Sequence, residues 1–508
     1  MEKHVGMIRF IVAMLCWGCL SWAPLSASFR YRLSLVDKAD SECRALTPRA
    51  LERRAKQGIA IDSTDYALSS RYLSALESAG LTICSRSHWL NSVVVMSTTG
   101  EEIAADFWAN FPFVKQVETV TTTEKGLSPI HRIEKHRSMP VDMNAESTVS
   151  VIPSDDFRAP MYQVHGEALY DAGHRGAGML VAVVDGGFHN IHTFPWLYDR
   201  VVGARDMYAP ADSLSLFAAE IHGAQVFSVM ASDSAHGIWG TACEADYFLI
   251  RSEFAPSETP FEEDQWVAAL ELADSLGVDV VNSSLGYFMF DNSTYNHSHD
   301  DFAQGRTFVS RGARLAAEKG MLLCVAAGNE RSSSWQRIIF PADVEEVLSV
   351  GAVDGNGQPT YFTSLGFLSP YVKPDVSCRG QQSFVIDTST GLPTFNGGTS
   401  FASPFLCGLA TSLWGAYPML TAAQVRDIVR RSASDYLNPN TLTGYGLPDF
   451  SIALSEARAL AGGAAIESLF TDKTTTSHKG IFDLSGRPLP TRPARGLYIE
   501  NGRLRHSF

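Results

Sequence analysis

The sequence of 508 residues has little positive charge, few cysteines and, beyond its first residues, no long apolar run. Its 41 Lys and Arg residues stand against 55 Asp and Glu residues, and the net charge of −14 argues against nucleic acid as the main partner. No later stretch reaches the roughly 18 apolar residues that a membrane-spanning helix requires. What remains is a chain with enough length for two or three domains and enough apolar residues for a large core.

The first 28 residues have the pattern of an export signal. Lys3 and Arg9 precede an apolar run over residues 11–25, and Ser26-Ala27-Ser28 offers small residues for cleavage. The run is short for a membrane anchor and is interrupted by small and polar residues, which disfavours that alternative. We therefore predict a signal peptide over residues 1–28, a secreted or cell-envelope location and no transmembrane span once the signal is removed.

Cysteine spacing indicates neither a zinc site nor a dense disulfide framework. Cys324 and Cys407 lie in apolar segments, which predicts that they are buried as small apolar side chains. A disulfide between Cys43 and Cys84 stays open, because export permits one.

Patterning divides the remaining sequence into four parts. Residues 29–123 alternate strand-like and helical segments, including a predicted helix at 101–110, and predict a small α+β domain with an open sheet. Residues 124–158 combine charge and proline without an apolar period, as is typical of a linker open to proteolysis. Residues 159–458 alternate apolar strands with amphipathic helices, which predicts a parallel sheet with helices on both faces. A Gly/Ala break after Ala459 predicts a separate tail over residues 459–508, with two short strands.

The large domain is expected to contain short strands and longer helices. Strands are predicted at residues 180–184, 247–251, 278–282 and 321–325, and helices at residues 264–275, 310–319, 401–417 and 421–434.

Asp185 and His222 are the first two candidate catalytic residues in the sequence. Asp185 ends an apolar strand and is followed by two glycines, at a place where open α/β sheets collect functional groups. Asp185 could instead cap the next helix, but a dinucleotide site is excluded because the Gly-rich turn precedes the strand rather than following it. His222 begins an apolar helix with small neighbours, and a buried carboxylate such as Asp185 could orient it as a base.

A hydroxyl and an amide complete the candidate set. Ser400 lies in Gly398-Thr399-Ser400, immediately before a long apolar helix, where a serine is ordinarily a cap. The neighbouring glycines clear space for a substrate, and the helix end offers N–H groups to a developing oxyanion. Asn329 follows an apolar strand end, where it is either a turn residue or a second oxyanion donor. No G-x-S-x-G motif surrounds Ser400, which disfavours an esterase.

These motifs resemble those of the subtilisin-like serine proteases, the subtilase family. The family's Asp motif corresponds to Asp185-Gly186-Gly187, its His motif to His222-Gly223-Ala224-Gln225 and its Ser motif to Gly398-Thr399-Ser400-Phe401-Ala402. Lys373-Pro374-Asp375-Val376 matches a further family signature. The resemblance covers residues 29 to about 458 and keeps the subtilisin order Asp, His, Ser.

The resemblance implies a role for each matched residue. Ser400 would be the nucleophile, His222 the general acid and base, Asp185 its orienting carboxylate and Asn329 the oxyanion donor. The pocket for the residue before the scissile bond would be walled by Ser284, Leu285, Gly286, Ala326, Ala327 and Gly328. The chemistry requires no cofactor; calcium sites are common in the family, but their ligands cannot be placed in this sequence.

The resemblance also implies an architecture. It predicts an α/β fold, a subtilisin-like three-layer arrangement with a mostly parallel central sheet, preceded by a small ferredoxin-like α+β propeptide. Residues 29–123 would act as an intramolecular chaperone and inhibitor, and residues 124–158 would be the processing region. The basic residues of 49–56 would either meet an acidic catalytic surface or remain solvated.

A secreted serine endopeptidase made as a zymogen, acting on protein or peptide substrates, is therefore the predicted function. A catalytically weak or inactive binding protein on the same fold is the alternative. Four positions depart from the family pattern, namely Gly186, Ala224, Gln225 and Phe401. None of them carries the proton transfer, so the departures do not exclude activity.

Overall fold

The computed structural model describes residues 29–121, 156–212, 214–471, 481–482, 488–492, 496–500 and 503–507. The predicted signal peptide and almost all of the predicted linker lie outside these residues. Within the described ranges, no helix is both long and apolar enough to cross a membrane.

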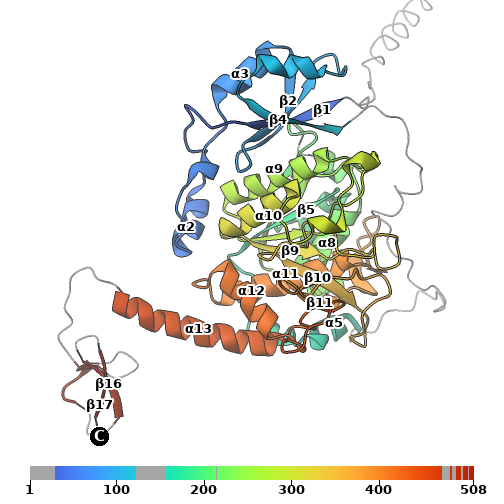
Figure 1. Ribbon diagram of the computed structural model, residues 1–508. Helices are drawn as coiled ribbons and strands as arrows, with labels where there is room; N and C mark the ends of the chain where they lie inside the picture. The colour runs from blue at the N-terminus through green and yellow to red at the C-terminus, as the bar shows by residue number, and fades with distance from the viewer. Residues whose placement is uncertain are drawn as a thin grey trace, which may run out of the picture.

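A seven-stranded parallel sheet forms the centre of the large domain, with the strand order β11-β10-β9-β8-β5-β7-β6 (Figure 1). The strands are β5 (Leu180–Asp185), β6 (Val201–Asp206), β7 (Asp246–Arg251), β8 (Val280–Ser283), β9 (Leu322–Ala326), β10 (Leu348–Val353) and β11 (Val376–Arg379). Strands β5, β8, β9 and β10 are buried along their whole length, because helices cover both faces of the sheet. The predicted fold class is confirmed. Strands β6, β10 and β11 were not predicted from the sequence.

Alternate side chains of β5 separate the two layers of the core. Val181 and Val183 pack with helices α8 (His222–Ala231) and α11 (Thr399–Ala416). Ala182 and Val184 pack on the opposite face with α9 (Phe261–Leu276) and α10 (Phe308–Glu318). This period of two follows from strand geometry.

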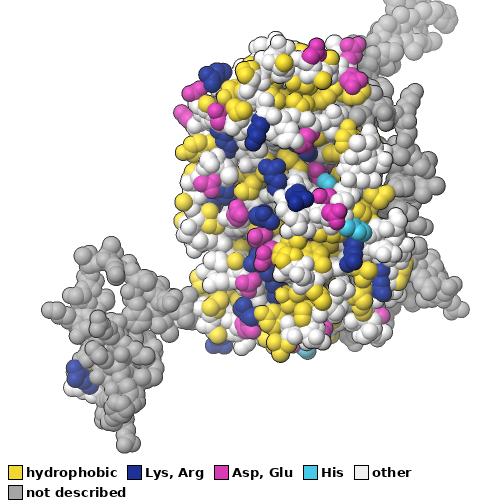
Figure 2. All heavy atoms as spheres, in the orientation of Figure 1, with side chains coloured by type: hydrophobic (Ala, Val, Ile, Leu, Met, Phe, Trp, Pro, Cys, Tyr) yellow, Lys and Arg dark blue, Asp and Glu magenta, His cyan; other side chains and the backbone are white. Residues whose placement is uncertain are grey.

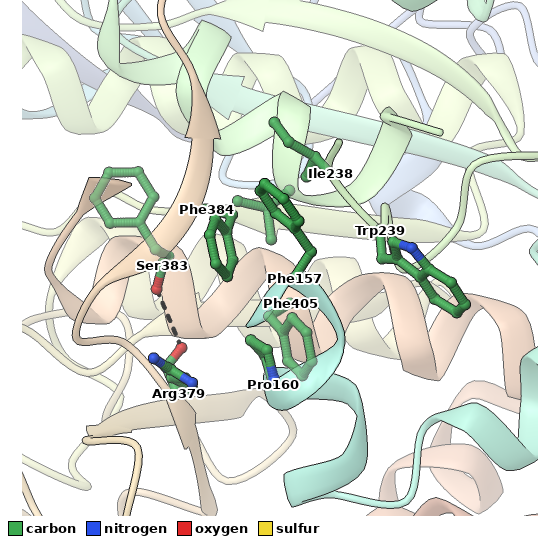
Figure 3. A pocket seen from close by; sticks show the side chains of 10 residues that line it. Phe157, Pro160, Ile238, Trp239, Arg379, Ser383, Phe384 and Phe405 are labelled. Carbon is green, nitrogen blue, oxygen red and sulfur yellow. Dashed lines mark hydrogen bonds between the residues drawn. The ribbon is translucent and has the colours of Figure 1, made fainter. Parts of the chain in front are cut away.

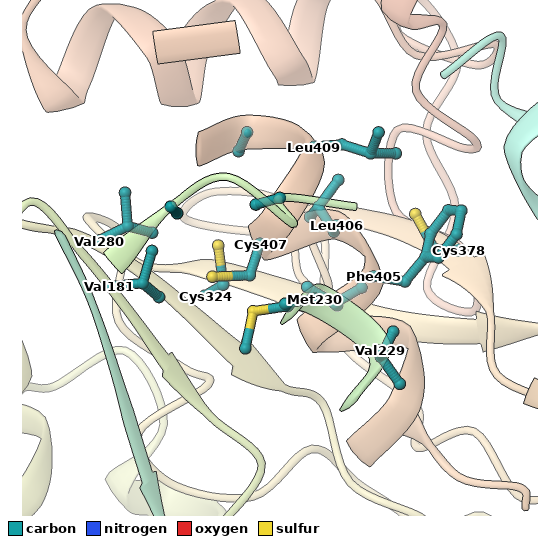
Figure 4. Packing of buried hydrophobic residues seen from close by; sticks show 14 of the residues in the cluster. Val181, Val229, Met230, Val280, Cys324, Cys378, Phe405, Leu406, Cys407 and Leu409 are labelled. Carbon is teal, nitrogen blue, oxygen red and sulfur yellow. The ribbon is translucent and has the colours of Figure 1, made fainter. Parts of the chain in front are cut away.

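The apolar layer beneath α11 contains Cys324 of β9 and Cys407 of α11 (Figure 4). Both are buried, as predicted. Cys43 and Cys84 are free thiols, so the disulfide that the sequence left open between them is not formed.

Shorter elements complete the large domain. They are α5 (Ala159–Gln163), α6 (Glu167–Asp171), α7 (Pro195–Tyr198), the antiparallel pair β12 (Ser383–Ile386) and β13 (Pro393–Asn396), and α12 (Ala422–Arg431). The first residues of the domain pack in a small aromatic cluster, in which the centroids of the Phe157 and Phe384 rings lie 4.5 Å apart (Figure 3). Phe401 and Phe405 of α11 line the same small cavity, so the start of the domain packs directly behind the helix that carries Ser400.

The N-terminal domain is a four-stranded antiparallel sheet with the order β2-β3-β1-β4, the ferredoxin-like arrangement that was predicted. Its elements are β1 (Arg30–Leu35), α2 (Pro48–Lys56), α3 (Ser70–Ser78), β2 (Leu81–Ser87), β3 (Ser92–Ser97) and β4 (Val114–Thr121). The predicted helix over 101–110 is wrong: only a 3-10 turn forms, Ala105–Asn110. There the Phe107, Trp108 and Phe111 rings pack together, and tertiary packing overrides the helical pattern.

The predicted break after Ala459 is also wrong. Helix α13 (Phe450–Thr471) runs through it, anchored by the buried side chains of Phe450, Ala453 and Ala457. Each glycine in a helix costs only about 1 kcal/mol, which the alanine-rich sequence tolerates. Beyond the helix, four short strands rather than two form an antiparallel sheet: β14 (Ile481–Phe482), β15 (Pro488–Leu489), β16 (Gly496–Glu500) and β17 (Arg503–Ser507).

Candidate active site

Four of the predicted residues lie at one edge of the central sheet. Asp185 is the last residue of β5, His222 the first of α8 and Ser400 the second of α11, while Asn329 follows β9. The carboxyl ends of parallel strands meet at one edge, where α/β proteins place their ligands. The folded chain thus brings together groups that are up to 215 residues apart in the sequence, as from Asp185 to Ser400.

Asp185 and His222 form a pair in which the carboxylate is fully buried and the imidazole is partly exposed. The Asp185 Oδ1 atom lies 2.8 Å from His222 Nδ1 and also accepts a hydrogen bond of 2.8 Å from the Gly186 N–H. Burial alone would lower the pKa of the imidazole, but the negative charges of Asp185, Glu253 and Glu220 outweigh it and raise the pKa above the ordinary value. The carboxylate therefore fixes the ring and makes the neutral imidazole a stronger proton acceptor, which suits a general base.

Gly223 makes this close approach possible. A Cβ atom at this position would lie 2.7 Å from the Asp185 Cβ and 2.4 Å from the Gly187 carbonyl oxygen. Any larger residue would push α8, and with it His222, away from β5.

Ser400 lies at the start of α11 beside β8. Its Oγ is 3.5 Å from the Ser284 carbonyl oxygen, and the Ser284 hydroxyl donates a 2.8 Å hydrogen bond to the Ser400 carbonyl. Gly398 precedes the helix with φ +149°, a conformation that residues with a Cβ rarely adopt. The N-terminal end of the helix carries a partial positive charge that favours an anion beside Ser400.

The Asn329 side chain is held in one orientation by Thr399. Its Oδ1 accepts hydrogen bonds from the Thr399 N–H at 2.9 Å and from the Thr399 hydroxyl at 3.0 Å. The amide nitrogen consequently faces the space over Gly398, where a Cβ atom would lie 3.4 Å from it. The arrangement suits donation to an oxyanion formed beside Ser400.

Five of the six predicted pocket residues line a cavity of about 430 Å³ that also includes Asn329 and Ser400. They are Ser284, Leu285, Gly286, Ala326 and Gly328. Ala327 is a correction: it is fully buried and packs in the core beneath the cavity, because successive residues of an extended segment point to opposite sides. The loops at 255–258 and 288–296 also line the cavity, although the sequence did not predict it. Their only signal in the sequence was the presence of polar residues after a predicted strand.

Gln225, where the family has a second histidine, has a structural contact. Its Oε1 accepts a 2.8 Å hydrogen bond from the Asn396 side chain, and both residues are buried. The departure therefore links α8 to β13 and does not disturb the Asp185–His222 pair.

The N-terminal domain lies on α9 and α10, and Figure 2 shows basic side chains beside acidic ones over this region. Arg32 of β1 makes a two-pronged contact with Asp264 of α9, at 2.7 and 2.6 Å. Arg44, Arg53 and Arg54 converge on Asp274, which is fully buried, and Arg49 pairs with Asp279. The basic helix thus meets an acidic surface, one of the two alternatives that the sequence left open.

The described residues contain no group of three or more His, Cys, Asp or Glu side chains that could hold a metal ion. Calcium also binds backbone and amide oxygens, so the expectation of a calcium site remains untested.

Comparisons with known proteins agree with this geometry. The model of the subtilase family matches residues 176–446, and the model of a peptidase S8 propeptide domain from Bacteroidota matches residues 30–136. Subtilisin DY of Bacillus licheniformis is 29% identical over 286 residues, which cover 56% of this chain and 93% of that relative. Subtilisin NAT of Bacillus subtilis subsp. natto is 28% identical over 288 residues, covering 56% and 68% respectively. Among solved structures, fervidolysin from Fervidobacterium pennivorans shares the fold, with a TM-score of 0.54 and 17% identity over 86% of this chain and 62% of its own.

Proposed function

The chain belongs to the subtilase family, and we propose that it is an exported serine endopeptidase in which Ser400 forms an acyl-enzyme. The observation that carries the proposal is that Asp185 and His222, in contact at 2.8 Å, lie at the same edge of the sheet as Ser400 and Asn329, which line one cavity. The serine-peptidase family and the propeptide domain themselves are established by the two family matches.

In the proposed reaction the Ser400 hydroxyl attacks the peptide carbonyl while His222 takes its proton. Asp185 holds the other ring nitrogen and stabilises the imidazolium that results. The Asn329 amide and the Ser400 N–H donate to the developing oxyanion. His222 then gives its proton to the leaving amine, and a water molecule activated by the same imidazole hydrolyses the ester on Ser400.

The N-terminal domain is proposed to hold the enzyme as a zymogen. Its last strand, β4, ends at Thr121, whose Oγ1 lies 3.4 Å from that of Thr259 beside the cavity. Residues 29–123 are therefore the proposed inhibitor, and removal of the domain and the linker after export would free the cleft.

A fluorophosphonate probe tests the proposal. Chain that has lost its N-terminal domain should be labelled, and peptide mass spectrometry should find the label on Ser400. Because the neutral imidazole is the base, the labelling rate should fall as the pH is lowered through the raised pKa of His222. The pH at which the rate is half its maximum should lie above 6.5. Initial rates from about pH 5 to about pH 9 measure this. Absence of label, even after the N-terminal domain is removed by trypsin, would favour the inactive binding protein.

Loss of the second oxyanion donor should slow catalysis without preventing folding. Asn329→Ala is expected to reduce kcat by about 10²–10³-fold with a smaller change in KM, a magnitude that comes from a subtilisin itself. The comparison is steady-state hydrolysis of one peptide by the two mature proteins. Asn356→Ala, in an exposed turn, serves as the control and should retain wild-type turnover. An unchanged kcat in Asn329→Ala would remove the oxyanion assignment.

A further inference from the structure

A small aromatic cavity behind the candidate active site is lined by both α8 and α11 (Figure 3). Val229 of α8 lines it, as do Phe401 and Phe405 of α11 and Phe384 of β12. The Phe157 ring enters this space from the first residues of the large domain, and Figure 3 shows it beside Phe384 and Phe405. The space left among these side chains is about 20 Å³, which holds no more than about one water molecule. Phe157 therefore nearly fills the cavity.

The cavity reaches both helices that carry the proposed proton-transfer groups. Val229 lies seven residues after His222, or about two helical turns, so both side chains lie along one face of α8. Phe401 directly follows Ser400 on α11 and is almost fully buried. The ring centroids of Phe401 and His222 are 5.8 Å apart. Through Phe401 the cavity is therefore in contact with the imidazole itself.

Two sets of ring contacts hold the Phe157 segment in place. The centroids of the Phe157 and Phe384 rings are 4.5 Å apart, and the Phe384 ring lies 4.7 Å from that of Phe395 in β13. The guanidinium of the adjoining Arg158 lies 4.6 Å from the centroid of the Trp239 ring. Aromatic pairs and cation–π contacts at these distances are favourable. The segment is thus attached to β12, to β13 and to the loop that carries Trp239.

Removal of the Phe157 ring would leave a void in contact with both helices. Side chains around such a void lose packing partners, and the helices are then free to shift toward it. His222 and Ser400 lie on different helices, so a shift of α8 relative to α11 changes the distance between the imidazole and the hydroxyl. A misplacement of about 1 Å can slow a reaction by about 10²-fold. Binding of substrate depends on a separate cavity, whose described lining shares no residue with the aromatic one.

We infer that Phe157 is a positioning residue for the proposed reaction, and that its ring sets the spacing between α8 and α11. The cavity is an aromatic-binding site, and Phe157 is its occupant in this structure. A free molecule of the size of benzene belongs to the same chemical class and fits the space that the ring would vacate. The inference rests on the proposed peptidase function and adds to it a residue that acts on His222 and Ser400 through Phe401.

Steady-state hydrolysis of one peptide by mature wild type, Phe157→Leu, Phe157→Val and Phe157→Ala tests the inference. We expect kcat to fall in that order, by about 10–100-fold in Phe157→Ala, while KM changes by less than about twofold. The split is expected because the spacing of His222 and Ser400 governs the chemical step, whereas the substrate cavity keeps its lining. Leucine retains much of the apolar volume, so Phe157→Leu should stay folded even where the smaller side chains do not.

Two comparisons distinguish positioning from general stability. Benzene at millimolar concentration should restore part of the lost kcat of Phe157→Ala and leave the wild type unchanged, because only the variant has the vacated space. Phe367→Ala is the matched control, since its partly buried ring lies 5.6 Å from that of Tyr371 and outside the described lining of both cavities. That variant also loses a ring contact but should keep the wild-type kcat. Thermal unfolding of each protein measures the accompanying loss of stability.

The outcomes separate the inference from the function on which it rests. N-terminal sequencing first identifies where each mature chain begins. A fully active chain that begins after Phe157 would overturn the inference, as would an unchanged kcat in Phe157→Ala. An equal loss of kcat in Phe367→Ala, or restoration by neither leucine nor benzene, would remove the assignment to the Phe157 ring. In each of these cases Ser400 is still labelled by fluorophosphonate, and the peptidase function stands. A wild type that is not labelled and hydrolyses no peptide would overturn the proposed function, and the positioning role with it.

Discussion

The Ser400→Ala protein is expected to remain full length, whereas wild-type residues 29–508 lose about 95–130 N-terminal residues, the span of the predicted propeptide and linker. Without its hydroxyl the active site keeps only binding and oxyanion donation. In a subtilisin, a member of this family, the corresponding loss lowers kcat by about 2 × 10⁶-fold, and the same order is expected here. Intact mass over time, together with fluorophosphonate labelling, measures both effects.

The substitution should leave the fold in place. The Ser400 Oγ makes only a long 3.5 Å contact to the Ser284 carbonyl, so its removal costs little stability. The matched control is Ser412→Ala on the same helix, where the buried hydroxyl donates 2.8 Å to the Thr241 carbonyl. That variant loses a better hydrogen bond but should process normally. Shortening of purified Ser400→Ala at the wild-type rate would show that Ser400 does not perform the cleavage.

The Asp274→Asn protein is expected to hold its N-terminal domain far more weakly. Asp274 is fully buried and accepts from Arg54 at 2.6 Å, and Arg44 and Arg53 share the same carboxylate. Breaking a buried pair typically costs 3–5 kcal/mol, because the remaining charge stays buried without its partner. Opening of the interface should therefore become at least about a hundredfold more frequent.

Hydrogen exchange measures this opening when Ser400→Ala is present to prevent cleavage. Amides of residues 29–121 should exchange faster in Asp274→Asn. Glu52→Gln gives the comparison on α2, since Glu52 forms only an exposed pair with Lys56 at 3.2 Å. Such surface pairs contribute about 1 kcal/mol or less. Equal exchange in the two variants would mean that the arginines of α2 do not hold the domain.

Much of the fold was predictable because it depends on local pattern. Apolar runs of strand length marked β5, β7, β8 and β9 to within two residues, since a parallel strand buried on both faces has few polar positions. Strand β6 was missed because its side chains are mostly half-exposed, and its pattern resembles a loop. The predictions for residues 101–110 and for the region after Ala459 were wrong because the local signal was misleading. Aromatic packing outweighed it in the first segment, and continuation of helix α13 outweighed it in the second.

The sequence by itself determined the kinds of chemical groups at the candidate site and their order along the chain. It could do so because Asp185, His222, Asn329 and Ser400 each lie beside small residues in short local motifs. Only the tertiary structure decided that Asp274 receives three arginines, and that Glu258 and Glu330 line one cavity. Those pairings join residues tens to hundreds of positions apart, and no local pattern encodes them. They arise when helices and loops pack around the sheet, where burial makes each charge depend on its neighbours.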